Sequence, residues 1–439
     1  MLIQFRVENY LSFNEVQSLS LIKGQSRSLK EHVQEVGDKG ILRTAAIFGA
    51  NASGKTNLIE AIIKSLTYII SGIPIPPNEY CRTSKPNREK PTSFEYEIEI
   101  DGQTFVYGFE VILFVSKIKR EWLYQLDGPG KKVIFERTGR IITDLKKEGE
   151  DGTRFTVYAE DAINMPQRLF LTDIGRRNFG EGSEFGIFKK ILMWLTTNIR
   201  IVPAGVPTGF VFSQEQTALS SKALSAYGAG VTEVSSELLD GGFKPIPQSA
   251  IDMLLDDFRK RNKKNPSPGE IITAIRNPES LEPLLIALDE SGNPAVKKLI
   301  FRHGEESFEY NEESDGTNRL MDLLPILSKD SGNEAIYIID ELDRSMHPQL
   351  TQKFVRDFEN LCGKSKRQLI FTTHESRLMD LALLRRDEIW FAEKNKDGNT
   401  ALFSLEDFNE RGDRRVDKAY LEGRYGATPC FKSLFPPLE

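Results

Sequence analysis

The sequence predicts an α/β protein that combines a mixed sheet, an antiparallel β subdomain and a helical insertion. First, the apolar run ILRTAAIFG, typical of a buried strand, leads through a glycine-rich loop into the helical pattern KTNLIEAIIKSLTYIISG. Second, four alternating segments between residues 92 and 137, with Asp-Gly and Pro-Gly turns among them, predict an antiparallel meander. Third, apolar residues recur at helical spacing from about residue 170 to residue 302.

Composition excludes several classes of protein. The chain has 439 residues, of which 39% are apolar and 28% are charged, so a globular protein of two or three domains, or of one large domain with insertions, is expected. The net charge of −6 argues against a generally basic nucleic-acid-binding protein and leaves only a local basic patch open. The N-terminus has no signal pattern, no run approaches about 18 apolar residues, and the three cysteines are isolated. We therefore expect a cytoplasmic protein without a membrane span.

The order of the patterns divides the chain into three expected parts. Residues 1–169 form an N-terminal half that holds the glycine-rich loop and the meander and begins with the strand pattern LIQFRVENY. Residues 170–300 are expected to be mainly helical, with helices over FGIFKKILMWLTTNI, AIDMLLDDFRKR and LEPLLIALDE. Residues 301–439 carry the strand patterns LIFRHG, ESFEY, EAIYIIDE and RQLIFTTHE, then a hairpin of DEIWFAEK and TALFSLED. The run RKRNKK, residues 259–264, is either a solvated loop or a contact for nucleic acid or an acidic partner.

The motif GANASGKT, residues 49–56, matches GxxxxGK[ST] between a strand pattern and a helix pattern, as a phosphate-binding P-loop requires. Glycines let successive backbone N–H groups point at phosphate, and the helix N-terminus adds a favourable dipole. Lys55 is expected to reach the β- and γ-phosphates of ATP, and the Thr56 hydroxyl to bind Mg²⁺. The residues predicted to contact the nucleotide are Gly49, Ala50, Asn51, Ala52, Ser53, Gly54, Lys55, Thr56 and Asn57.

Polar residues end two further strand patterns. Asp340 and Glu341 follow AIYII, and we expect Asp340 to hold Mg²⁺, directly or through water, and Glu341 to activate the attacking water as a general base. His374 follows RQLIFTT; alone it would be an ordinary polar cap residue, but beside the other motifs it is predicted to contact the γ-phosphate. Lys55, Glu341 and His374 are the predicted catalytic residues.

The P-loop, the acidic strand end followed by LDRSMHP, and the strand-end histidine occur in an order that resembles the ABC-type ATPase head shared by transporter subunits, SMC proteins and RecF. The resemblance implies a signature loop that contacts the γ-phosphate bound by a partner subunit. SDGT, residues 314–317, occupies that place: Ser314 and Gly316 match, whereas Asp315 and Thr317 depart from the pattern. Asp343 resembles the residue of the loop that lies at the dimer interface in this family. A homodimer or higher homo-oligomer through ATP-bound heads is therefore implied.

The opening FRVENYLSF, the later DELDRSMHP and the tail AYLEGRYGATP resemble the OLD-like ATPases of bacterial anti-phage defence, in particular the stand-alone ATPase subunit of AbiL- or PARIS-type two-gene systems. Too few residues follow His374 for the C-terminal nuclease domain of OLD proteins. The resemblance implies an ATP-hydrolysing sensor or scaffold that controls a separate effector, expected to be a nuclease from an adjacent gene.

Other functions stay open at this point. A RecF- or SMC-like DNA-repair ATPase that binds DNA in an ATP-dependent way is the main alternative, which the acidic composition disfavours modestly. A transporter motor is disfavoured by the long stretch between P-loop and signature. A nucleotide-binding scaffold that barely turns over is disfavoured by the intact Lys55, Asp340 and Glu341. The segment GRYGATP either packs a C-terminal lobe or binds a partner.

Overall fold

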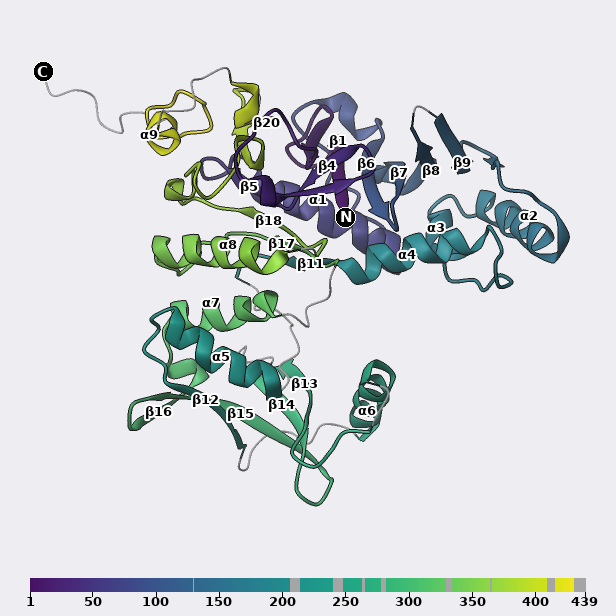
Figure 1. Cartoon of the computed structure of the whole chain (residues 1–439). Helices are drawn as coiled ribbons and strands as arrows, with labels where there is room; N and C mark the ends of the chain where they lie inside the picture. The colour runs from purple at the N-terminus through teal and green to yellow at the C-terminus, as the bar shows by residue number, and fades with distance from the viewer. Residues whose placement is uncertain are drawn as a thin grey trace, which may run out of the picture. The chain divides into compact units, whose positions relative to one another are not determined.

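The computed structural model describes residues 1–128, 130–205, 214–239, 248–262, 265–277, 282–328, 334–363, 365–408 and 415–429 (Figure 1). The chain forms two compact units. The first comprises Met1–Pro203, Gly332–Leu342 and Cys362–Glu439, and the second comprises Ala204–Ser331 and Asp343–Leu361. The second unit therefore takes residues from both the region expected to be helical and the expected C-terminal half.

A six-stranded, mostly parallel sheet forms the centre of the first unit. Its order is β11-β17-β18-β5-β19-β20, with β20 alone antiparallel to its neighbour. The strands are β11 (Ile199–Val202), β17 (Ile336–Ile339), β18 (Gln368–Thr372), β5 (Thr44–Phe48), β19 (Ile389–Lys394) and β20 (Thr400–Ser404). Every residue of β5, β17 and β18 is buried, which explains why these strands read as continuous apolar runs.

The first unit also contains a seven-stranded antiparallel sheet, in the order β10-β9-β8-β7-β6-β1-β2. The predicted meander is confirmed as β6 (Thr92–Ile100), β7 (Gln103–Ile112), β8 (Lys117–Asp127) and β9 (Gly130–Arg137). The predicted N-terminal strand is β1 (Leu2–Glu8), which pairs β6 and β2 (Gln17–Ser20). Short strands β3 (Val33–Val36) and β4 (Lys39–Leu42) form a separate pair, and β10 (Ile141–Ile142) ends the large sheet.

Helices of the first unit contribute aromatic side chains to one continuous hydrophobic core. Helix α1 (Lys55–Ser71) ends at Gly72, as predicted, where φ is 71°. Helices α2 (Gly149–Ile163), α3 (Phe170–Ile174) and α4 (Gly186–Asn198) contribute Phe155, Phe170 and Phe188, whose rings lie 5.8 to 6.0 Å apart. Helix α9 (Val416–Leu421) follows β20 and is drawn in yellow in Figure 1.

The second unit is built on an antiparallel sheet of order β12-β15-β14-β13, with β16 also pairing β15. Its strands are β12 (Glu233–Leu238), β13 (Ile271–Arg276), β14 (Pro283–Leu288), β15 (Pro294–His303) and β16 (Glu306–Glu309). Its helices are α5 (Gln214–Ala226), α6 (Gln248–Asn262), α7 (Asp315–Leu323) and α8 (Pro348–Cys362, whose last residue belongs to the first unit). Phe258 of α6 packs with Ile272 and Ile286 of the sheet.

The prediction of a helix over LEPLLIALDE is wrong, because Pro283–Leu288 is the central strand β14. All six of its residues are buried, so the run has no polar face from which a period can be read, and pairing with β13 and β15 decides its conformation. Helices were correctly expected over α4 and α6. The basic run begins in the last turn of α6, at Arg259, and its residues 263 and 264 lie outside the described residues. Among the described residues no helix is both long enough and apolar enough to cross a membrane.

Candidate nucleotide site

The motif of residues 49–56 is a loop between β5 and α1, as the sequence predicts. Gly49 and Gly54 have φ values of 154° and 110°, and Gly54 is the N-cap residue of α1. The Lys55 side chain is buried, and its Nζ donates to the carbonyl oxygens of Gly49 at 2.7 Å and Ala50 at 3.1 Å. The loop therefore curls around the ammonium group, while Thr56 is exposed in the first turn of α1.

Close packing requires glycine at two positions of the loop. A Cβ on Gly54 would lie 2.2 Å from Thr400 Oγ1, and a Cβ on Gly49 would lie 2.4 Å from the carbonyl oxygen of Ala392. Thr400 Oγ1 lies 2.7 Å from the carbonyl oxygen of Ser53, so β20 supports the loop from beneath. Only glycine fits at these two positions, because the Thr400 side chain lies against Gly54 and the Ala392 backbone lies against Gly49.

Asp340 and Glu341 follow β17, and both are held by Thr372 at the end of β18. The Thr372 hydroxyl donates to Asp340 Oδ1 at 2.5 Å and accepts from the backbone N–H of Glu341 at 2.8 Å. Asp340 is 2% exposed, and its own N–H donates to Val202. Glu341 has φ of 51°, a left-handed conformation that a non-glycine residue seldom adopts.

Parallel pairing brings these strand ends to one edge of the sheet. Ile339 of β17 pairs Phe371 of β18, and Thr372 pairs Ile47 of β5, so the residues that follow each strand emerge side by side. Neighbouring strands lie about 4.8 Å apart. His374, two residues beyond β18, lines a cavity of about 780 Å³ together with residues 49–53 of the loop. This edge is where open α/β sheets bind ligands.

Ser314, Gly316 and Asp343 belong to the second unit. The Ser314 side chain caps α7 by accepting from the N–H of Thr317 at 3.1 Å. A Cβ on Gly316 would lie 2.9 Å from the carbonyl oxygen of Ser345, in the turn that Asp343 begins by accepting from the N–H of Met346. The signature-like loop and the turn after Glu341 are thus packed together within this unit.

One protein family matches more than half of the chain, over residues 45–160 and 236–380: "AAA domain, putative AbiEii toxin, Type IV TA system". The chain belongs to this family. The match includes the P-loop, Ser314, Asp340 and His374 and agrees with the expected P-loop ATPase. Membership in this family does not show whether the chain is an AbiL- or PARIS-type subunit, so this finer assignment stays a prediction.

Solved SMC head domains resemble the structure at low identity. A head bound to the C-winged helix domain of ScpA matches with a TM-score of 0.44 and 13% identity, covering 92% of this chain and 97% of that chain. The SMC head of Thermotoga maritima gives 0.35 and 11%, covering 92% and 98%. A head with an extended coiled coil, bound to the C-terminal domain of ScpA from Pyrococcus furiosus, gives 0.37 and 13%, covering 97% and 98%. No curated protein matches the sequence.

Further residues support or line the site of this family member, and the sequence patterns did not point to them. Thr372 reads as an ordinary strand residue, although a hydroxyl at the end of a strand beside two acids was a usable signal. Ser12 and Thr400 support the loop: Asn57 Nδ2 donates to Ser12 Oγ at 2.7 Å, and Thr400 Oγ1 lies 2.8 Å from that oxygen. Tyr420, Leu421 and residues 427–429, far along the chain, also line the cavity, and no local pattern reveals this.

Proposed function

We propose that the protein is an ABC-type ATPase that binds and hydrolyses ATP at sites shared between two copies of the chain. The observation that carries this proposal is the convergence of three strand ends. The P-loop after β5, His374 after β18 and the Asp340–Glu341 pair after β17 emerge at one edge of a parallel sheet. Family membership supports the same class of chemistry.

The loop fits a polyphosphate. Gly54 leads into α1, so the first N–H groups of a 17-residue helix and the buried Lys55 Nζ face the loop interior, which favours negative charge. Ser53 Oγ is buried and has no hydrogen-bond partner among the described residues. A buried hydroxyl without a partner costs about 1–3 kcal/mol, and a phosphate oxygen would satisfy it.

Oxygen donors suited to Mg²⁺ stand at the same edge. The Thr56 hydroxyl is exposed at the start of α1, and the Asp340 carboxylate is buried and oriented by Thr372. Hydroxyl, carboxylate and phosphate oxygens form the hard ligand set that Mg²⁺ prefers. Thr56 and Asp340 would hold the ion, which would supply charge neutralisation to the phosphates when bound.

Glu341 is the proposed general base and His374 the proposed γ-phosphate contact. The left-handed backbone of Glu341 costs of order 1 kcal/mol or more, and such outliers concentrate at functional sites. Its N–H is held by Thr372, which fixes the direction in which the carboxylate leaves the strand. A carboxylate so oriented accepts a proton from water that attacks the terminal phosphate.

The second half of the site is proposed to come from another copy of the chain. Ser314 and Gly316 open α7, where the capping hydroxyl and helix N–H groups are donors suited to a phosphate. They would contact ATP bound to Lys55 of the other subunit, with Asp343 at the interface. The protein would then act as a homodimer or a higher homo-oligomer.

The biological role we propose is that of the sensor or scaffold of a bacterial anti-phage system, which controls a separate effector, expected to be a nuclease. The family description names a toxin and a toxin–antitoxin system, which supports a two-component arrangement. The resemblance to AbiL- and PARIS-type subunits supports the defence role.

The ATPase proposal is tested by Glu341→Gln, which keeps the size of the side chain and removes the base. We expect ATP binding to persist, turnover to fall by roughly three orders of magnitude, since general-base catalysis contributes about 10²–10⁴-fold, and an ATP-bound dimer to accumulate. Glu375→Gln, which changes the same residue type near the next strand end, serves as the matched control. Unchanged turnover in Glu341→Gln would rule out the general-base assignment.

The defence role is tested by expressing the intact gene with its neighbour and challenging the cells with a broad phage panel. Protection that disappears with Lys55→Ala supports it, and absence of protection by the intact pair contradicts it. Measurement of DNA binding with and without ATP at physiological salt then separates a repair ATPase from a defence subunit.

A further inference from the structure

The C-terminal segment, residues 416–429, lies beside the P-loop although the two are distant in the sequence. Tyr420, Leu421 and residues 427–429 line the same cavity of about 780 Å³ as residues 49–53 and His374. The segment comprises helix α9 and the GRYGAT turn that follows it. All of these residues belong to the first unit.

Hydrogen bonds fasten the segment to the P-loop and to β19. The N–H of Ala50 donates to the carbonyl oxygen of Ala427 at 2.8 Å, and the N–H of Ala427 donates to Glu393 Oε1 at 2.9 Å. The Tyr420 hydroxyl donates to the same carbonyl at 3.0 Å, and Ala427 has a φ of 55°. A Cβ on Gly426 would lie 2.7 Å from the Glu393 carboxylate, so the turn packs without space for a side chain there.

An aromatic stack also holds the segment against β19. Phe391 of β19 is fully buried, and its ring stacks on those of Tyr420 and Tyr425. The ring centroids lie 5.6 Å apart for Tyr420 and 5.7 Å apart for Tyr425, with interplanar angles of 19° and 24°. Tyr425 is 2% exposed. Packing therefore accounts for Tyr425, and the turn is held rigidly against the sheet that carries the P-loop.

Leu421 is not explained by packing. Its side chain is 67% exposed, yet it lines the cavity together with residues 49–53 of the P-loop. Ala427 and Pro429 add apolar surface to the same wall. A charged phosphate chain does not bind favourably to an apolar surface. A purine ring has a flat, largely apolar face, which packs against aliphatic and proline side chains.

We infer that the C-terminal segment is the wall that receives the base of the bound nucleoside triphosphate, with Leu421 as its main apolar contact. This inference rests on the proposed ATP-binding function. The P-loop holds the phosphates, and the segment, fixed to Ala50 through Ala427, holds the base at a set distance from them. The cavity is within the range of about 300–1,000 Å³ that small-molecule sites occupy.

The test compares two ligands that share the phosphate chain, ATP and inorganic tripolyphosphate, by calorimetric titration of Leu421→Ala. We expect ATP affinity to fall roughly five- to tenfold, as for the loss of part of a leucine contact, and tripolyphosphate affinity to stay unchanged. Leu238→Ala is the matched control, because Leu238 is a leucine that is 55% exposed in β12. Unchanged ATP affinity in Leu421→Ala, or an equal loss for both ligands, overturns the inference.

Photolabelling gives a second readout that needs no variant. In the wild-type chain, 8-azido-ATP should attach to a peptide within residues 416–429, and unlabelled ATP should suppress the attachment. Label confined to other peptides overturns the base-binding wall. Failure of the wild-type chain to bind either ATP or tripolyphosphate overturns the proposed ATPase itself, and this inference with it, so the two failures are distinguishable.

Discussion

Thr372, at the end of β18, touches both acids that end β17: its hydroxyl donates to Asp340 and accepts from the backbone N–H of Glu341. One side chain thus orients the proposed metal ligand and the proposed general base. Hydrogen bonds of this kind fix a carboxylate at low entropic cost, because strand pairing already fixes the donor. Activity should therefore depend on a residue that is not itself expected to touch the nucleotide.

Thr372→Val keeps the shape of the side chain and removes the hydroxyl. We expect turnover to fall roughly 10- to 100-fold, as for other partners of metal-ligating carboxylates, and the free energy of unfolding to fall by about 1–3 kcal/mol. Thr351→Val is the control, since Thr351 is fully buried and its hydroxyl has no hydrogen-bond partner among the described residues. Turnover in Thr372→Val equal to that of the control would contradict the orienting role.

Gly54→Ala is expected to destabilise the first unit by about 3 kcal/mol or more, because it adds left-handed strain and an overlap with Thr400. Gly37→Ala separates the two causes: Gly37 has φ of 60° and open space around it, so strain alone should cost about 1 kcal/mol. Chemical denaturation of both variants gives the comparison. Equal losses would mean that the approach of β20 to the loop does not matter.

Ser314→Ala removes the N-cap of α7. We expect a loss of about 1 kcal/mol in the free energy of unfolding of the second unit, and Ser314→Thr, which keeps a hydroxyl, should lose less. Urea denaturation followed by circular dichroism measures both. A larger loss in the threonine variant would show that the hydroxyl bond to Thr317 is not the stabilising contact.

Ser314→Arg tests the shared site. A bulky cation at this helix start should leave ATP binding to the P-loop of the same chain intact, while ATP-driven dimer formation and hydrolysis both fail. Size-exclusion chromatography with light scattering, with and without ATP, detects the dimer. Normal ATP-driven association of this variant would argue that Ser314 does not lie at an interface.

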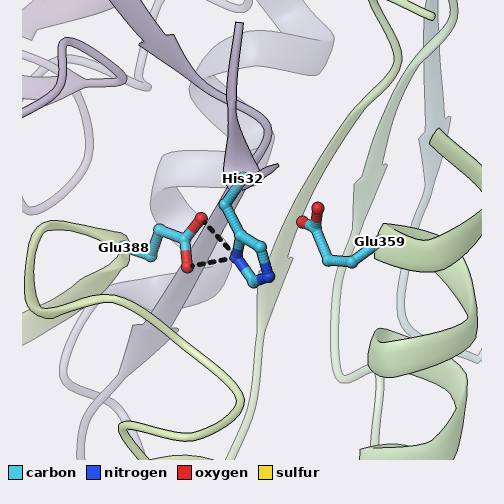
Figure 2. A group of neighbouring side chains, drawn as sticks. All are labelled: His32, Glu359 and Glu388. Atoms are coloured by element: carbon cyan, nitrogen blue, oxygen red, sulfur yellow. Dashed lines mark hydrogen bonds and ion pairs between the residues drawn. The ribbon is translucent and has the colours of Figure 1, made fainter. Parts of the chain in front are cut away.

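The buried pair of His32 and Glu388 predicts a pH dependence of stability. His32 Nδ1 lies 3.0 Å from both carboxylate oxygens of Glu388 (Figure 2). Burial raises the pKa of Glu388 well above its ordinary value of 4.5, and the nearby Asp387 adds to this effect. Between the two pKa values, the folded chain therefore holds a proton that the unfolded chain has released. The stability that this group contributes is complete below about pH 4.5 and is lost as the pH rises through the raised pKa.

Glu388→Gln removes this titration and keeps a neutral side chain of similar shape. As the pH rises above about 4.5, the fall in melting temperature should be smaller in Glu388→Gln than in the wild-type chain. Asp38→Asn, in an exposed turn, is the control and should follow the wild-type curve. An identical pH profile in the glutamine variant would refute the raised pKa.

Local patterns predicted the parts of the fold in which local and tertiary preferences agree. The P-loop lies between β5 and α1 as expected, because glycine spacing and the helix pattern act within a few residues. The meander followed from period-two alternation, since one face of each strand is buried. The helix predicted where β14 lies was wrong because local and tertiary preferences differ there. An apolar run that is buried on all sides shows no period, and pairing with β13 and β15 decides its conformation.

By itself, the sequence determined the P-loop, the two acids after β17 and the alternation of the antiparallel sheet. Only the tertiary structure decided which residues hold these parts in position. Thr372 reaches Asp340 through the parallel pairing of β17 and β18, and the carbonyl of Ala427 reaches Ala50 across nearly the whole length of the chain. Such contacts join segments without any shared local pattern, because packing of the sheet, and not spacing along the chain, brings their atoms together.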